Sequence, residues 1–201
     1  MIKFDVPRDN NILKELEDWR KSINFADALL GSESINNDTY EKHEDKSSIL
    51  SLLTEEYLNE TIIPSENKHD IGQVNNINLG HNSLHHQKIS ANFHMNLQIE
   101  GLEFDRISGA FWYPPTGFMG WHSNADHEAY RMYAAWAEEG HKSFFRYRDP
   151  NTKKIVTSWD KKGWNFRLFN CSQEDKPWHC VYSDTNRISL GFWYNGILAT
   201  A

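Results

Sequence analysis

A chain of 201 residues is long enough to bury one substantial hydrophobic core, as a single domain or as a core with an attached helical lobe. Its formal net charge of −7 offers no basic footprint for nucleic acid, and no segment approaches the ~20 apolar residues of a membrane span. We therefore expect neither a nucleic-acid nor a membrane partner. The first five residues lack the apolar run of a secretory signal, so Cys171 and Cys180 are expected as reduced thiols in the cytoplasm.

The first 87 residues predict helices followed by a loop. Apolar residues at helical spacing predict one helix over 10–21 and a second over 47–58, which ends by about Pro64. Residues 65–87 are polar and without periodicity, and they predict a long loop. Its histidines match no tight ligand spacing, which favours a solvated loop; a loop that folds over an active site is the alternative. These histidines are His69, His81, His85 and His86.

From about Lys88 the chain changes to short alternating segments separated by turns, the pattern of an all-β sandwich or barrel. We therefore predict a mainly β fold: a jelly roll, with the N-terminal helices of segment 1–87 packed on a core of residues 88–201. The predicted strands are 106–113, 131–137, 142–148, 154–159, 164–169, 178–182 and 187–194. In the first of them, one face is expected to carry Ile107, Gly109, Phe111 and Tyr113.

Two histidines of this β region are candidate metal ligands. His122 is followed two residues later by a polar side chain, Asn124, and His179 lies in a later strand. Side chains i and i+2 of an extended segment point the same way, so His122 and Asn124 can reach one ion. His179 would complete a face of three ligands, and that face leaves room on iron for a bidentate 2-oxo acid and dioxygen.

Arg187 is the candidate anchor for an acidic co-substrate. It shares a predicted strand face with Ser189, whereas Ile188 and Leu190 face the other way. A cation on an apolar strand is costly unless an anion meets it, and a guanidinium offers a planar fork that suits a carboxylate. A structural salt bridge to a carboxylate of the protein itself is the alternative.

The segment 113–194 resembles the double-stranded β-helix core of the 2-oxoglutarate- and Fe(II)-dependent dioxygenases, especially the prolyl-4-hydroxylase-like branch. The family's His-x-Asp or His-x-Glu motif falls on His122-Ser123-Asn124, its distal histidine on His179 and its basic residue on Arg187-Ile188-Ser189. The resemblance implies a hydroxylase that uses Fe(II) and 2-oxoglutarate on a small-molecule or peptide substrate and releases succinate and carbon dioxide. It implies iron ligation by His122, Asn124 and His179, and co-substrate binding by Arg187, Ser189, Arg131 and Tyr113.

Asn124 departs from the family's carboxylate, and three interpretations stay open. Its amide oxygen is a weak neutral ligand or leaves a water in its place, as in members that work with two histidines. Alternatively, Asp126 reaches the metal through a backbone bulge. In the third, a halide takes the position, as in the halogenating branch. Asparagine fills the space that a halide needs, so the first interpretation is favoured and the third ranks last.

Two other classes of protein compete with an oxygenase. One is a non-catalytic β-sandwich binding module whose metal site has decayed, and succinate production would exclude it. The other is a cupin-like metal protein with different chemistry, which would not bind 2-oxoglutarate. A zinc protease is disfavoured, because Arg131 stands where a His-Glu-x-x-His motif beginning at His127 requires the second histidine.

Overall fold

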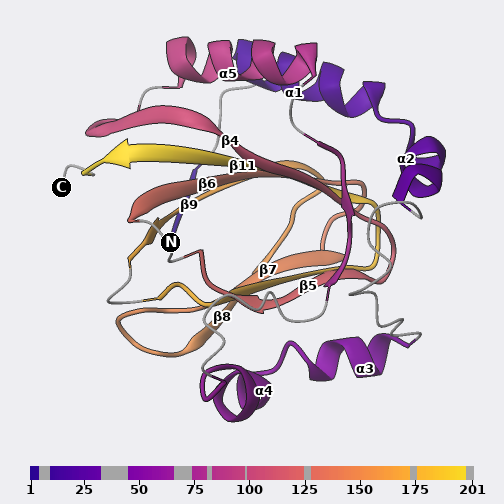
Figure 1. The fold of residues 1–201 in the computed structure, drawn as a ribbon, viewed down its shortest axis with the longest axis vertical. Coiled ribbons are helices and arrows are strands. Elements are labelled where there is room, and N and C mark those ends of the chain that lie inside the picture. The colour runs from indigo at the N-terminus through magenta and orange to yellow at the C-terminus, as the bar shows by residue number, and fades with distance from the viewer. Residues whose placement is uncertain are drawn as a thin grey trace.

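The computed structural model of the chain describes residues 1–4, 10–32, 45–65, 74–80, 83–97, 99–124, 128–172 and 176–197. Two antiparallel sheets face each other, and helices cover their outer faces (Figure 1). The strand orders are β1-β9-β6-β11-β4-β3 and β2-β5-β10-β7-β8. The strands are β1 (Ile2–Phe4), β2 (Val74–Asn75), β3 (Ile77–Asn78), β4 (Leu102–Tyr113), β5 (Gly117–His122), β6 (Ala129–Ala137), β7 (Ser143–Arg148), β8 (Ile155–Trp159), β9 (Gly163–Cys171), β10 (His179–Ser183) and β11 (Arg187–Gly196).

The strands from β4 to β11 pair as one long hairpin wound into a roll. β7 pairs with β8, β6 with β9, β5 with β10 and β4 with β11, so each pair encloses the one before it. The pairs alternate between the sheets: β7-β8 and β5-β10 lie in the five-stranded sheet, β6-β9 and β4-β11 in the six-stranded one. This nesting is the topology of a jelly roll and confirms the predicted fold class.

Three helices pack on the outer face of the six-stranded sheet: α1 (Asn11–Ser22), α2 (Phe25–Ser32) and α5 (Leu84–Asn96) (Figure 1). Asn10 caps α1, because its side chain accepts a hydrogen bond from the Ile12 amide at 2.9 Å. Apolar side chains of α1 and α5 meet those of β6 and β11, and the Phe93 ring stacks on Phe192 with centroids 4.0 Å apart. The inner face of this sheet faces the five-stranded sheet and borders the candidate site described below.

A second set of short helices packs against the five-stranded sheet: α3 (Lys46–Ser51), α4 (Glu55–Tyr57) and the π-helical turn η1 (Leu58–Ile62). Ile49, Leu53 and Leu58 are buried against this sheet, and the Trp121 indole donates to the carbonyl of Thr54 at 3.0 Å. No helix among the described residues is long and apolar enough to cross a membrane.

Besides β1 and α2, which were not predicted, the N-terminal elements differ from the prediction in two places. The helix expected over 47–58 is interrupted after Ser51, since the Thr54 hydroxyl accepts from the Tyr57 amide and starts a new turn. The described part of 65–87 holds β2, β3 and the start of α5, which Ser83 caps together with His86. Because α5 runs to Asn96, the uninterrupted series of strands begins with β4 at Leu102 and not at Lys88; the division at residue 87 stays a prediction.

Ile107 was predicted to share one face of its strand with Gly109, Phe111 and Tyr113, but in β4 its side chain points to the opposite face. Gly191 pairs with Gly109 but Phe192 pairs with Ile107, so Ser108 is an extra residue in β4. Such a bulge reverses the alternation of side chains. Ile107 therefore packs under the helices, whereas Phe111 and Tyr113 face the interior of the roll.

Candidate metal centre

His122 and His179 lie opposite each other on neighbouring strands. His122 ends β5, His179 begins β10, and the two are partners in the register, with ring centroids 4.1 Å apart. Their exposed fractions are 7% and 1%. The nested strand pairing thus brings together two histidines that are far apart in sequence, as the sequence analysis expected.

Each imidazole is held by a backbone carbonyl two residues before it. His122 Nδ1 lies 2.9 Å from the oxygen of Gly120, and His179 Nδ1 lies 2.6 Å from that of Pro177. A carbonyl oxygen only accepts, so Nδ1 carries the proton in both rings and Nε2 keeps its lone pair. Metal-ligating histidines are commonly oriented in this way.

Both imidazoles are neutral at physiological pH. Burial lowers the pKa of His122 to about 4, although the hydrogen bond to Gly120 opposes the shift. Burial also holds the pKa of His179 well below its ordinary value, and the neighbouring His122 adds to this effect. The neutral form is the one that binds a metal ion, so this pair needs no deprotonation before it does so.

Asn124 sits between His179 and a tyrosine. Its Nδ2 donates to the Tyr133 hydroxyl at 2.9 Å and lies 3.3 Å from His179 Nε2. Because that Nε2 is an acceptor, the amide turns its NH₂ group toward it. Among the described residues, no three His, Cys, Asp or Glu side chains converge on a common point. Asp126, the alternative ligand, lies outside the described residues.

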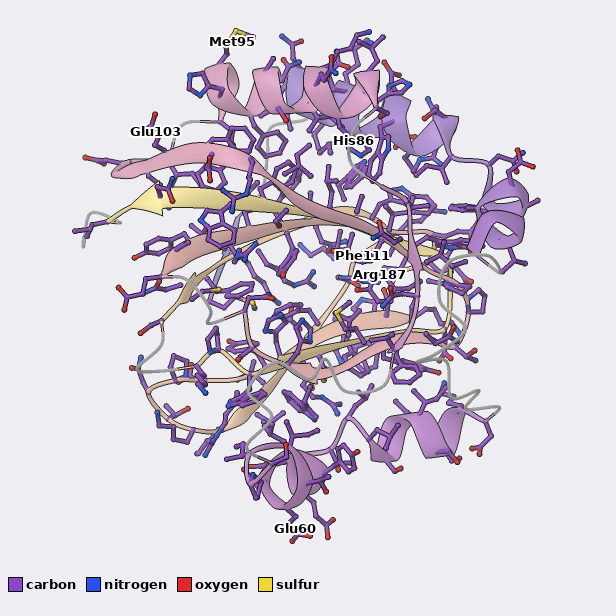
Figure 2. The ribbon with its side chains drawn as sticks, viewed as in Figure 1. Glu60, His86, Met95, Glu103, Phe111 and Arg187 are labelled. Carbon is purple, nitrogen blue, oxygen red and sulfur yellow. The ribbon has the colours of Figure 1, made fainter. Side chains whose placement is uncertain are left out.

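A pocket of about 310 Å³, counting its open mouth, borders the two histidines. Its wall is mostly aromatic and apolar, which keeps water from the histidines. Besides the histidines it is lined by Phe111, Tyr113, Met119, Tyr133, Phe145 and Ser189, among others. Figure 2 shows Phe111 and Arg187 in the space between the two sheets. Burial raises the pKa of Tyr133, so its hydroxyl is protonated in the metal-free protein.

Arg187 belongs to a buried ionic cluster next to this pocket. Its Nε donates to Asp160 Oδ2 at 3.0 Å, and Arg167 Nη2 lies 2.6 Å from Asp160 Oδ1. The Ser143 hydroxyl also donates to Asp160. Burial would raise the pKa of Asp160, but the two guanidinium groups outweigh it and hold that pKa below its ordinary value. The salt bridge to a protein carboxylate, considered above as the alternative, is therefore present.

The cluster nevertheless carries a surplus positive charge, since two guanidinium groups share one carboxylate. In the described part of the structure, Nη1 of Arg187 and Nη1 of Arg167 have no hydrogen-bond partner. The Arg187 guanidinium lies 5.2 Å from the ring centre of Tyr113, which lines the pocket. A buried, incompletely paired cation is costly, so the surroundings of Arg187 favour an anion.

The remaining predicted residues divide into two groups. Ser189 and Tyr113 line the pocket, whereas Arg131 stacks on Trp193, with its guanidinium 3.5 Å from the ring centre. The sequence analysis did not assign roles to Tyr133, Asp160 and Arg167. Strand alternation placed Tyr133 on the face of Arg131, but nothing in the sequence indicated that its hydroxyl would meet Asn124.

Neither a protein-family model nor a curated protein sequence matches this chain. Among solved structures, a prolyl hydroxylase from Trichoplax adhaerens, in complex with a hypoxia inducible factor peptide, is 12% identical over 90% of this chain and 93% of its own (TM-score 0.38). A Pseudomonas putida prolyl-4-hydroxylase is 18% identical over 61% and 68% (TM-score 0.37). A Burkholderia pseudomallei oxidoreductase of the 2OG-Fe(II) oxygenase family is 14% identical over 59% of this chain (TM-score 0.38), which spans only 57% of that protein. Likeness at this level carries no argument, so the function rests on the side chains themselves.

Proposed function

We propose that this chain is an Fe(II)- and 2-oxoglutarate-dependent oxygenase that hydroxylates a small molecule or a peptide side chain. The observation that carries the proposal is the pair of buried, neutral histidines on a pocket wall, each with Nδ1 held and Nε2 unprotonated. Such nitrogen donors fit iron. Bound there, iron and 2-oxoglutarate would supply the activation of dioxygen, with succinate and carbon dioxide as by-products.

His122 and His179 would hold the metal through Nε2. Asn124 now presents its NH₂ group to the same region, so it has to turn its carbonyl oxygen inward to become a neutral ligand or withdraw in favour of water. Rotation of the amide replaces the hydrogen bond that it donates to Tyr133 with one that it accepts from the same hydroxyl. A neutral oxygen compensates less of the charge of a dication than a carboxylate does, so we expect weaker iron binding than a carboxylate would give.

The surplus cation would bind the acidic co-substrate. Asp160 holds Nε of Arg187 and thereby fixes the plane of the guanidinium, while Nη1 keeps no partner among the described residues. Ser189 shares the inward face of β11 with Arg187 and adds a hydroxyl to the pocket wall. A carboxylate bound beside the Arg187 guanidinium would neutralise the positive charge that Asp160 leaves uncompensated.

The proposal is tested by metal and co-substrate binding to the purified protein. Without oxygen, the wild type should bind one Fe(II), and the loaded protein should then bind 2-oxoglutarate; with oxygen and candidate substrates it should form succinate. His122→Ala and His179→Ala should each lose the iron. His94→Ala, a change at an exposed histidine of α5, is the matched control. Stoichiometric iron in both pocket variants, or none in the wild type, would contradict the proposal.

A further inference from the structure

A metal held by His122 and His179 has no anionic ligand from the acidic or thiol side chains that the structure describes. Both imidazoles and the amide of Asn124 are neutral, so the charge of a dication would be left uncompensated by the side chains that the structure describes around it. The pocket wall does contain another ionisable oxygen close to the pair. It is the phenol of Tyr133, in the middle of β6.

The Tyr133 hydroxyl lies near Nε2, the unprotonated nitrogen of His179. The two share one neighbour, Asn124 Nδ2, which is 2.9 Å from the hydroxyl and 3.3 Å from His179 Nε2. The oxygen and the nitrogen are thus no more than two hydrogen-bond lengths apart. An ion bound at that nitrogen would therefore lie close to the phenol oxygen.

The ring of Tyr133 is placed firmly. Its centroid is 5.9 Å from that of Phe145 and 5.5 Å from that of Phe169. On the neighbouring strand β11 its partner is Gly191, where an added Cβ would come within 3.0 Å of the tyrosine ring. The glycine therefore leaves the room in which the phenol reaches the histidines.

We propose that Tyr133, as a phenolate, is the third protein ligand of the metal and supplies the negative charge that Asn124 lacks. The inference rests on the proposed function only in placing the metal at the histidine pair. When the metal binds, the phenol O–H bond breaks, the proton passes to the solvent, and the oxygen lone pair forms the bond to the metal; nothing is oxidised. A bound cation favours the ionised form of its ligands, and tyrosinate is a known iron ligand.

Asn124 then has a different role from that of a ligand. Its NH₂ group already donates to the Tyr133 oxygen, and the same hydrogen bond would stabilise the phenolate. The other pocket tyrosine is engaged elsewhere, because the Tyr113 hydroxyl donates to the sulfur of Met119 at 3.9 Å. Tyr113 therefore provides a matched control on the same pocket wall.

The experiment uses the colour of iron(III) tyrosinate. The full-length protein is loaded with Fe(II) without oxygen and treated with one equivalent of ferricyanide, which takes one electron from each iron and becomes ferrocyanide. We expect a visible charge-transfer band and phenolate ring vibrations in the resonance Raman spectrum excited within it. Tyr133→Phe should lose the band, and Tyr113→Phe should keep it.

The outcomes separate this inference from the function it rests on. Iron bound to the wild type without a charge-transfer band overturns the tyrosinate ligand and leaves the histidine site standing. A wild type that binds no iron overturns both. A band that survives in Tyr133→Phe also contradicts the inference. If Tyr133→Phe does not fold, a wild-type band that persists in Tyr113→Phe supports it, because no other tyrosine among the described residues lines the pocket.

Discussion

Asn124 donates to the Tyr133 hydroxyl and faces Nε2 of His179, so its side chain lies beside the proposed position of the metal. Asn124→Asp should therefore tighten Fe(II) binding, because the variant adds an anion beside a dication in a partly dry site. We expect a gain of about tenfold or more, which corresponds to about 1.4 kcal/mol. Competition with a coloured chelator under anaerobic conditions measures it.

Two further variants control this prediction. Asn124→Ala should not tighten iron binding, since it removes the amide without adding charge. Asp126→Ala tests the other candidate ligand and should leave the affinity unchanged. Loss of iron in Asp126→Ala, together with unchanged affinity in Asn124→Ala, would assign the third position to Asp126.

Arg187→Met should remove 2-oxoglutarate binding while the fold persists. Arg167 and Asp160 remain as a pair of opposite charges, so the buried cluster becomes neutral and no longer attracts an anion. Truncating one member of a buried charged pair typically costs about 2–5 kcal/mol of binding, or more than about thirtyfold in affinity. Titration calorimetry of the iron-loaded protein gives this value.

Arg106→Met is the control for that variant, since it removes an exposed arginine of β4 that lies over Trp193. It should keep the co-substrate affinity of the wild type. Equal affinity for 2-oxoglutarate in Arg187→Met and the wild type would mean that Arg187 pairs only with Asp160 and does not bind the co-substrate.

At the scale of single residues, the sequence analysis named His122, His179 and Ser189 as candidate site residues, and all three line one pocket. They were recognised from their spacing and from strand alternation. Spacing and alternation could not show the partner of Arg187. Asp160 lies in the turn between β8 and β9, and its contact with Arg187 depends on how the two sheets close on each other. The contact between Tyr133 and Asn124 was not predicted for the same reason, because side-chain packing across the roll leaves no recognisable pattern in the local sequence.

Among the secondary-structure elements, α5 allows a test of how much the outer helices contribute to the stability of the jelly roll. Phe93 is fully buried and stacks on Phe192, so Phe93→Ala should leave a cavity between α5 and the six-stranded sheet. The expected loss in the free energy of unfolding is about 3–5 kcal/mol. Chemical denaturation followed by circular dichroism measures it.

Leu84→Ala, in the same helix, is the control, because that side chain is 66% exposed. Its effect should lie within about 0.5 kcal/mol of the wild type. Equal losses in the two variants would show that helix propensity, and not packing on the sheet, determines the stability contributed by α5.

Alternation of side chains revealed β6 and β11 in the sequence, whereas β5 was not predicted. β6 and β11 carry one apolar face under the helices and one face toward the pocket, so their period of two is visible in the sequence. β5 is buried throughout and shows no such period. α5 was assigned partly to a loop, since polar residues surround its buried Ile89 and Phe93.

For the molecule as a whole, the two sheets carry helices on both outer faces and keep ionisable groups between them. Burial in that interior makes stability depend on pH. The pKa of His122 falls from 6.5 to about 4 on folding, so between these values the unfolded chain binds a proton there that the folded protein does not. Stability is therefore complete above about pH 6.5 and decreases as the pH falls toward 4, with about 3 kcal/mol from this histidine alone.

His179 should steepen the same decline, because its pKa is lowered as well, whereas Asp160 is protonated only at more acidic pH, below this window. Denaturant titrations of the metal-free protein between about pH 7 and pH 4.5 measure the slope. His122→Gln should flatten it, since glutamine binds no proton, and the exposed His94→Gln should not. A wild-type stability that does not change across this range, or a slope that His122→Gln leaves unaltered, would show that the two histidines are not buried as neutral groups, and the argument for a metal at their Nε2 atoms would fail with it.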